Sequence, residues 1–180
     1  MSSSYKNILN YGNIFESIIF MTNPKSIVEF GILDGYSLNC FLNNTKIDTK
    51  ITAYDIFDKF NGNHAKSSIK EKYDLYDNVI IEYGDFYKKY NDLQDNSIDI
   101  LHIDIANTGY TYTFALENYL NKLTKHGVMI LEGGSIHRDN VYWMDKYNKS
   151  KIIPVLEKYK DKINIKTIGD FPSITLVTKL

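Results

Sequence analysis

Five acidic side chains lie at or beside the ends of short apolar runs, and these are the residues of the sequence best suited to chemistry. They are Glu29, Asp55, Asp85, Asp104 and Glu132. Carboxylates gathered in one place can hold an ammonium group or ribose hydroxyls, and a carboxylate can take the proton of a hydroxyl nucleophile. Any one of these acids could instead be a solvated loop residue, but their recurrence at successive run ends favours a binding site.

A glycine-containing turn follows the first of these runs. The apolar stretch 26–30 leads to Gly31, Gly35 follows, and a helix-forming segment begins at Tyr36. Glycine lets the backbone adopt a positive φ or approach a ligand closely, and a helix start offers unpaired N–H groups. The stretch therefore predicts a strand, a tight turn and a helix start that together hold a small nucleoside-containing cofactor.

Alternating strands and helices must position these residues. Apolar runs predict strands at residues 26–30, 50–55, 78–83, 97–104 and 128–131. Helices are predicted at about 7–21, 36–42, 65–73 and 112–123, the last one closed by His126-Gly127, and a mixed helical region interrupted near Ser150 is predicted at about 138–160. The β-rich runs 163–168 and 173–178 are separated by residues 169–172 and predict a hairpin.

This order of elements predicts an α/β fold. We expect a Rossmann-like, doubly wound sheet of seven strands that is mostly parallel and ends in an antiparallel C-terminal hairpin. In open α/β sheets ligands bind at the carboxyl ends of the strands, which is where the acids fall. A chain of 180 residues suits a single domain over 1–180, in which residues 1–24 form an N-terminal helix that packs on the core.

Composition excludes several classes of function. A hydrophobic content of 43% and a charged content of 24% are typical of a globular protein. The formal net charge of −1 gives no general attraction to nucleic acid or to an anionic membrane, and no apolar run is long enough to span a bilayer. The N-terminus lacks the layout of a signal peptide and Cys40 is the only cysteine, so we expect a cytoplasmic protein in a reducing compartment.

The spacing of the glycine turn discriminates between cofactors. A dinucleotide-binding G-x-G-x-x-G motif needs glycines at the positions of Leu33 and Tyr36, so a pyrophosphate is disfavoured here. A phosphate-binding loop is not encoded, because no lysine follows Gly35. Asp55 lies about 20 residues beyond Gly35, where an acid takes ribose hydroxyls in such sheets. A ribose without a pyrophosphate suggests S-adenosylmethionine.

Taken in order along the chain, these segments resemble class I S-adenosylmethionine-dependent methyltransferases. The similarity is greatest to the small O-methyltransferases of the catechol, caffeoyl-CoA or sugar type, and it covers nearly the whole chain. The matching segments are 29–37, 51–55, 84–86, 101–104, 125–131 and the terminal hairpin. The ordered set is much more specific than the first motif alone.

The resemblance implies how the methionine end of S-adenosylmethionine is held. The backbone at Gly31 and Gly35 is expected to lie against the methionine and ribose part. Glu29 and Asp104 are expected to hold or orient the positively charged amino group, and Ser37 is expected to help from the helix start.

The same resemblance implies contacts for the nucleoside end. Asp55 is expected to bind the ribose hydroxyls. Asp85 is expected to accept a hydrogen bond from the adenine amine, with Phe86 packing nearby.

The acceptor side departs from the pattern of the catechol type, which binds a divalent metal through acids after the fourth and fifth strands. Asp104 is present, but the next acid of that motif falls on Ala106 or Asn107, and the Asp-Asn pair reads Glu132-Gly133. Asp104 and Glu132 remain candidate catalytic residues. They give two carboxylates where hard cations prefer several oxygen ligands, so a divalent metal is compatible with the sequence but not favoured.

Residues beyond the fifth strand are candidates for the rest of the acceptor pocket. His137 could reach the site as a catalytic base, or it could be a capping or surface histidine. Arg138 could clamp an anion beside a wall formed by Trp143, or the two could belong to helix packing and a surface ion pair.

The function predicted from these residues is methyl transfer from S-adenosylmethionine to a hydroxyl of a small molecule or sugar. A catalytically altered nucleoside-binding protein on the same fold is the main alternative, and an NAD-dependent oxidoreductase is opposed by Leu33 and Tyr36. No nucleic acid or membrane partner is expected. Because the chain has no large lid insertion, the N-terminal helix or a second copy of the chain in a homodimer is expected to close the acceptor site.

Overall fold

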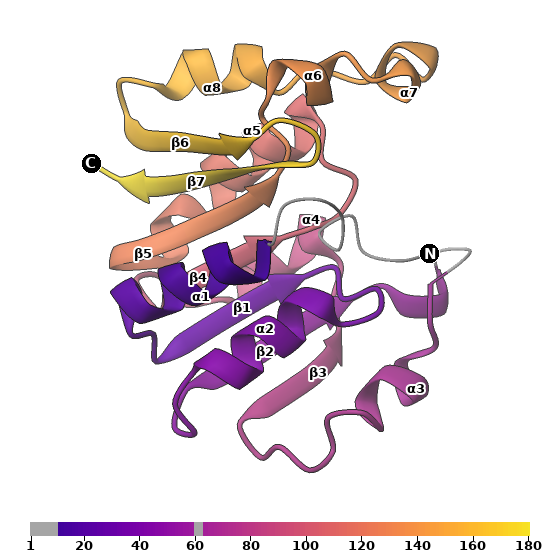
Figure 1. Ribbon diagram of the computed structural model, residues 1–180, viewed down its shortest axis with the longest axis vertical. Helices are drawn as coiled ribbons and strands as arrows, with labels where there is room; N and C mark the ends of the chain where they lie inside the picture. Colours follow the sequence, from indigo (N-terminus) through magenta and orange to yellow (C-terminus); the bar gives the residue numbers. More distant parts are fainter. Residues whose placement is uncertain (1–10, 60–62) are drawn as a thin grey trace.

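A single mixed sheet forms the centre of the molecule, and the computed structural model describes it together with the rest of residues 11–59 and 63–180. Its strands are β1 (Ser26–Phe30), β2 (Lys50–Asp55), β3 (Val79–Tyr83), β4 (Ile98–Ile103), β5 (Leu123–Glu132), β6 (Ile163–Gly169) and β7 (Ser173–Lys179). They are arranged in the order β3-β2-β1-β4-β5-β7-β6 (Figure 1). β1 to β5 pair in parallel, and β7 is antiparallel to both β5 and β6. The predicted Rossmann-like sheet with an antiparallel hairpin is therefore confirmed.

Helices cover both faces of this sheet. One face carries α1 (Tyr11–Thr22), α2 (Tyr36–Asn44) and α3 (Lys66–Lys70), and the other carries α4 (Phe86–Lys89), α5 (Gly109–Asn118) and α8 (Ile153–Tyr159). Figure 1 shows α1 and α2 in front of the strands. Because successive side chains of a strand point to opposite faces, Ile27 packs in the first layer and Val28 in the second.

Short elements complete the chain between these helices and strands. They are η2 (Phe57–Lys59), η3 (Tyr90–Asp92), η4 (Leu120–Lys122), α6 (Ile136–Asp139) and α7 (Tyr142–Lys146). The helical region expected at 138–160 is thus three short helices, α6, α7 and α8. The first predicted helix begins at residue 7, and residues 7–10 lie outside the described part of the chain.

The structure corrects the role assigned to His126-Gly127. These residues do not close a helix, because α5 ends at Asn118 and β5 already begins at Leu123. Leu123 pairs with Ile98, and the register shifts before Val128 pairs with Ile100. A Cβ atom at Gly127 would lie 2.7 Å from the Ile98 carbonyl oxygen. Gly127 therefore allows β5 to pack closely against β4 where the register between these two strands shifts.

The membrane expectation can be checked on the helices. Of those that the structure describes, none combines the length and apolar character that crossing a bilayer requires.

Candidate functional site

The predicted acids meet at one edge of the sheet. Phe30 of β1 pairs with Tyr54 of β2 and with Ile103 of β4, and Ile103 pairs with Leu131 of β5. The residues at the carboxyl ends of these strands therefore lie side by side, as the parallel pairing requires. Through this register the structure brings together Glu29, Asp55, Asp104 and Glu132, while Asp85 lies just beyond β3 at the start of α4.

The glycine turn leaves β1 and passes directly against β4. Gly31 has φ +92°, and a Cβ atom there would lie 2.1 Å from the carbonyl oxygen of Asp104. The Asp104 N–H in turn donates to the Phe30 carbonyl at 2.9 Å. Gly31 is therefore required for contact between two backbones, so that Asp104 is held beside the turn. Leu33 within the turn also has a positive φ, of 48°, which is strained backbone for a leucine.

Gly35 is the residue before α2, and it is covered by Tyr73, which the sequence motifs did not single out. Gly35 has φ +83°, and a Cβ atom there would lie 2.2 Å from the hydroxyl oxygen of Tyr73. That hydroxyl donates to the Gly35 carbonyl at 3.3 Å or to Asn39 Oδ1 at 3.2 Å. Burial, the largest cause, and the charges of Glu29 and Asp34 together raise the pKa of Tyr73 to about 12. The Tyr73 hydroxyl therefore stays neutral at physiological pH and packs against the glycine turn.

Glu29 is fully buried at the centre of the edge. Its Oε1 accepts a hydrogen bond from the Ser37 hydroxyl at the start of α2 and lies 2.9 Å from His102 Nδ1 on β4. Its Oε2 has no hydrogen-bond partner among the residues that the structure describes. A buried carboxylate oxygen without a donor is costly, and an ammonium group would satisfy it. This orphaned oxygen fits the expectation that Glu29 holds the amino group of S-adenosylmethionine.

Asp55 ties two loops together at the end of β2. Its Oδ2 accepts from the Ile32 N–H at 2.7 Å, and its Oδ1 accepts from the Phe57 N–H at 2.6 Å and from Asn63 Nδ2 at 3.1 Å. A carboxylate has about four acceptor sites, so these protein donors leave little capacity for ribose hydroxyls. The ribose-binding role of Asp55 stays a prediction, and bracing the glycine turn is the role that the contacts describe.

Asp85 and Phe86 are also used by the fold itself. Asp85 Oδ1 accepts from the Tyr87 N–H at 3.0 Å and so caps α4. The Phe86 ring is buried, stacked on Tyr119 at 4.9 Å between centroids and edge-on to Phe30 at 5.4 Å. Phe86 therefore belongs to the core between the sheet and α5. The expected adenine contacts of both residues stay predictions.

The acidity of Asp104 is strongly perturbed. Desolvation is the largest cause, and together with the nearby charges of Glu132 and Glu29 it raises the pKa of Asp104 to about 7, against the opposing charges of His102 and Arg138. A carboxyl group with such a pKa changes protonation near neutrality. Asp104 is therefore suited to act as a general base at neutral pH.

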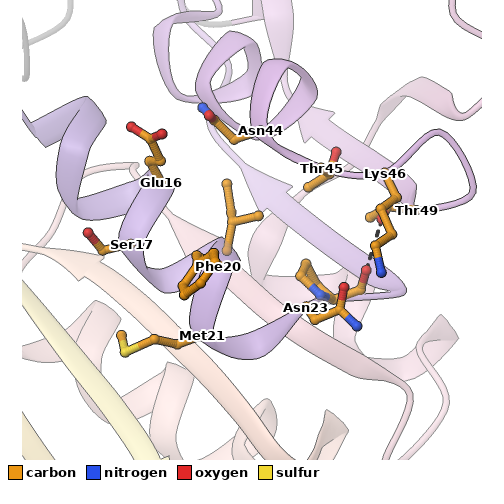
Figure 2. A pocket seen from close by; sticks show the side chains of 11 residues that line it. Glu16, Ser17, Phe20, Met21, Asn23, Asn44, Thr45, Lys46 and Thr49 are labelled. Atoms are coloured by element: carbon orange, nitrogen blue, oxygen red, sulfur yellow. Dashed lines mark hydrogen bonds between the residues drawn. The ribbon is translucent and has the colours of Figure 1, made fainter.

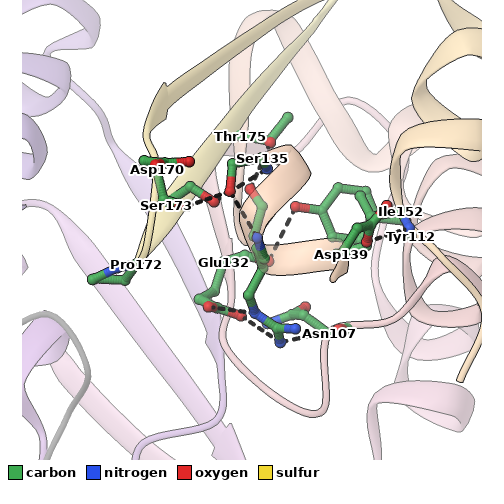
Figure 3. Close-up of polar contacts among 12 residues, drawn as sticks. Asn107, Tyr112, Glu132, Ser135, Asp139, Ile152, Asp170, Pro172, Ser173 and Thr175 are labelled. Atoms are coloured by element: carbon green, nitrogen blue, oxygen red, sulfur yellow. Dashed lines mark hydrogen bonds and ion pairs between the residues drawn. The ribbon is translucent and has the colours of Figure 1, made fainter. Parts of the chain in front are cut away.

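Glu132 is paired with a buried arginine. Arg138 Nε and Nη2 donate to the two carboxylate oxygens of Glu132 at 3.0 and 3.2 Å, and Nη2 also donates to the Asn107 carbonyl at 3.3 Å. The guanidinium carbon lies 4.7 Å from the centre of the Trp143 ring. Figure 3 shows Glu132 and Asn107 in this cluster beyond the end of β5.

This pair corrects the interpretation of Arg138. It is neither a free anion clamp nor a surface ion pair, because the Arg138 side chain is 6% exposed and its charge is compensated by Glu132. Its sequence neighbour Asp139 instead accepts from the N–H groups of Ile152 and Ile153 at 2.7 and 2.8 Å. Asp139 thus holds the start of α8.

His137 faces solvent on the outer side of α6. Its side chain is 69% exposed, and its Nδ1 pairs with a carboxylate oxygen of Asp170 in the turn between β6 and β7. If His137 acts as a base it must do so through Nε2. The structure does not bring His137 into contact with Asp104 or Glu132, and its catalytic role stays a prediction.

A divalent metal at this edge is compatible with the sequence but not favoured by it. Among residues 11–59 and 63–180, no cluster of three or more histidine, cysteine or acidic side chains suits a metal ion. Both oxygens of Glu132 are already bonded to Arg138, so a divalent ion would have to displace the guanidinium. The donor set therefore does not fit a metal shared between Asp104 and Glu132.

A separate hollow lies at the opposite edge of the sheet. It has a volume of about 670 Å³ and lies between the end of α1 and the segment joining α2 to β2 (Figure 2). Its lining includes the exposed side chains of Phe20 and Met21, with Glu16 and Lys46 as its charged residues. None of the predicted site residues lines it.

Comparisons with known proteins agree with this geometry. The sequence matches the model of a family described as a methyltransferase domain over residues 28–132. A search of curated protein sequences gives no significant match.

Solved structures share the fold at low sequence identity. A SAH-bound methyltransferase of Podospora anserina is 18% identical with a TM-score of 0.65, over 100% of this chain and 80% of that one. A methyltransferase of Geobacter sulfurreducens is 17% identical with a TM-score of 0.65, over 97% of this chain and 80% of that one. A Staphylococcus aureus protein, proposed to be a caffeoyl-CoA O-methyltransferase, is 17% identical with a TM-score of 0.69, over 97% of this chain and 85% of that one.

Proposed function

Because the chain belongs to the methyltransferase domain family, we propose that it transfers a methyl group from S-adenosylmethionine to a hydroxyl group of a small molecule or sugar. The observation that supports this most directly is the meeting of Glu29 and Asp104 beside the glycine turn, with one buried oxygen of Glu29 left without a donor. That arrangement suits a ligand with an ammonium group beside a nucleoside.

S-adenosylmethionine, when bound, supplies a methyl group that its sulfonium already makes electrophilic. The protein therefore has to hold two reactants in line more than it has to activate them. Glu29, fixed by Ser37 and His102, holds the ammonium group. The turn from Gly31 to Gly35, held by Asp55 and Tyr73, gives the nucleoside a rigid wall.

A base is needed when the acceptor is a weakly acidic hydroxyl. Asp104 is the first candidate, since burial raises its pKa to about 7 and it lies at the end of β4 next to the turn. In its ionised form it can take the proton that the acceptor hydroxyl gives up. Glu132 serves as the partner of Arg138 in this scheme and is not a free base.

Calorimetric titration tests the cofactor. S-adenosylhomocysteine is expected to bind and NADH is not, because Leu33 and Tyr36 stand where a dinucleotide motif needs glycine. Glu29→Gln is the matched variant, since it keeps the shape of the side chain and weakens the hold on the ammonium group. Binding of NADH in preference to S-adenosylhomocysteine would exclude the proposal.

Methyl transfer itself is tested with labelled S-adenosylmethionine and a metabolite extract. Label is expected in a neutral hydroxyl-bearing fraction and is expected to be lost with Asp104→Asn. A nucleoside-binding protein without catalysis is the second candidate, and the pairing of Glu132 with Arg138 is the observation that favours it, because both oxygens of this candidate catalytic carboxylate are already engaged. Tight binding of S-adenosylhomocysteine with no transfer to any fraction would select that candidate.

A further inference from the structure

Three polar atoms beside Asp104 and Glu132 lack hydrogen-bond partners in the described chain. They are Nδ2 and Oδ1 of Asn107 and Nη1 of Arg138. Asn107 is fully buried and Arg138 is 5% exposed, so bulk water does not satisfy them. Native proteins leave few buried polar atoms unpaired, because each one costs free energy. Such a group of atoms at a strand-end site therefore points to a ligand.

These atoms belong to one place in the fold. Asn107 lies in the loop between β4 and α5, three residues beyond Asp104. Its carbonyl accepts from Arg138 Nη2 at 3.3 Å, which ties the backbone of Asn107 to the guanidinium. The same guanidinium is fixed by Glu132 on one side and by the Trp143 ring on another. The contacts with Glu132, Trp143 and the Asn107 carbonyl therefore hold the residues that carry the unpaired donors and acceptor in fixed positions.

The chemistry of this group defines what it can bind. Arg138 Nη1 and Asn107 Nδ2 are donors, and Asn107 Oδ1 is an acceptor. A hydroxyl group, which both accepts and donates, satisfies such a set. An anion does not, because Glu132 already compensates the charge of Arg138 and the nearby Asp104 and Glu29 are acidic.

We infer that Asn107 and Arg138 form a subsite for an uncharged hydroxyl of the methyl acceptor. The hydroxyl donates to Asn107 Oδ1 and accepts from Arg138 Nη1 or Asn107 Nδ2, and the Glu132–Arg138 pair positions these donors. This inference rests on the proposed function, since it names the acceptor chemistry of the same site, and it predicts that acceptors with a carboxylate or phosphate at this position are rejected.

The first test is a comparison of stability. Asn107→Leu keeps the side-chain volume and removes the unpaired amide, so its Tm is expected to equal or exceed that of the wild type. Asn78→Leu is the matched control, because Asn78 Nδ2 donates to the Thr49 carbonyl at 2.9 Å at the opposite edge of the sheet. The control is expected to lower Tm and to leave methyl transfer unchanged. A fall in Tm for Asn107→Leu as large as that of the control would show a structural role for Asn107 and overturn the inference.

The second test observes the Asn107 side chain directly. Its amide signals in ¹H–¹⁵N spectra are assigned by their loss in Asn107→Leu, and the wild type saturated with S-adenosylhomocysteine is titrated with uncharged and anionic probes. Methyl glucopyranoside and phenol are the uncharged probes, and methyl glucuronoside and benzoate are the anionic ones. The amide signals are expected to shift with an uncharged probe and to stay in place with its anionic counterpart.

The outcomes separate this inference from the proposed function. Failure of S-adenosylhomocysteine to bind would count against the proposed function itself. If S-adenosylhomocysteine binds but no uncharged probe shifts the Asn107 amide signals, the subsite is overturned and the proposed function stands. The same holds if the anionic probes shift these signals as much as the uncharged ones do. For any acceptor that methyl transfer identifies, Asn107→Leu is expected to raise KM about tenfold, the loss of roughly one good hydrogen bond, with affinity for S-adenosylhomocysteine unchanged.

Discussion

Replacing Arg138 by methionine is the sharpest test of how the acceptor side is built. The guanidinium makes both charge-assisted hydrogen bonds that the Glu132 carboxylate receives, and the two side chains are 6% and 10% exposed. Methionine is flexible and similar in length, so Arg138→Met removes the charge and the donors while largely filling the space. The variant leaves Glu132 as a buried carboxylate without compensation.

The magnitude follows from that burial. Removing one partner of a buried ion pair costs about 3–5 kcal/mol of the free energy of unfolding. For a domain of this size such a loss lowers Tm by roughly 6–20 °C. Arg138→Met combined with Glu132→Gln removes both charges, and we expect the double variant to recover most of the loss. Because the two side chains are in contact, a double-mutant cycle on Arg138 and Glu132 should give a coupling free energy of about 2 kcal/mol or more.

Urea denaturation at pH 7 measures these differences, with S-adenosylhomocysteine binding as a check that the nucleoside side is intact. Lys25→Met is the matched control, since it breaks an exposed ion pair with Asp48 and should leave the stability nearly unchanged. Two results together would refute the view that Arg138 is the buried counter-charge of Glu132. Arg138→Met would lower the free energy of unfolding no more than Lys25→Met does, and the double variant would be no more stable than Arg138→Met.

Further predictions concern the rest of the edge. Gly31→Ala should unfold the turn and abolish S-adenosylhomocysteine binding by calorimetry, because its Cβ atom would lie 2.1 Å from the Asp104 carbonyl oxygen. Desolvation raises the pKa of Asp104 from 3.8 to about 7, so the stability that this group contributes at low pH is lost as the pH rises from about 4 to about 7. Asp104→Asn stays neutral, so urea denaturation should show it matching the wild type near pH 4 and exceeding it at pH 8 by on the order of 4 kcal/mol; equal differences at both pH values would contradict this. His137→Ala should leave methyl transfer within about twofold, because the exposed ring pairs with Asp170, and a hundredfold loss would instead assign it as the base.

Much of the fold follows from local patterns in the chain. Apolar runs and glycines gave β1 and β2 with the bounds that the structure has, and the hairpin within a residue at each strand. The ordered motifs from Glu29 to Leu131 identified the family, which the match over residues 28–132 confirms. Those features are encoded within short windows, because strand periodicity and turn chemistry depend on near neighbours in sequence.

Several roles were misassigned because they depend on distant partners. The local sequence predicts a helix end at Gly127, and only its contact with Ile98 on a neighbouring strand reveals why glycine is there. The sequence around Arg138 is compatible with an anion clamp or with a surface ion pair, whereas the side chain forms a buried pair with Glu132. No local pattern distinguishes these possibilities.

The sequence by itself therefore determined the sheet, the family and the set of acids that reach one edge. Tertiary structure alone decided which of those acids are already engaged by the protein. Asp55 accepts from backbone donors, Glu132 accepts from a guanidinium, and one carboxylate oxygen of Glu29 has no hydrogen-bond partner among the described residues. The physical reason is that a polar atom's availability depends on what is packed around it. Hydrogen bonds between residues far apart in the chain exist only once the fold has brought their backbones together.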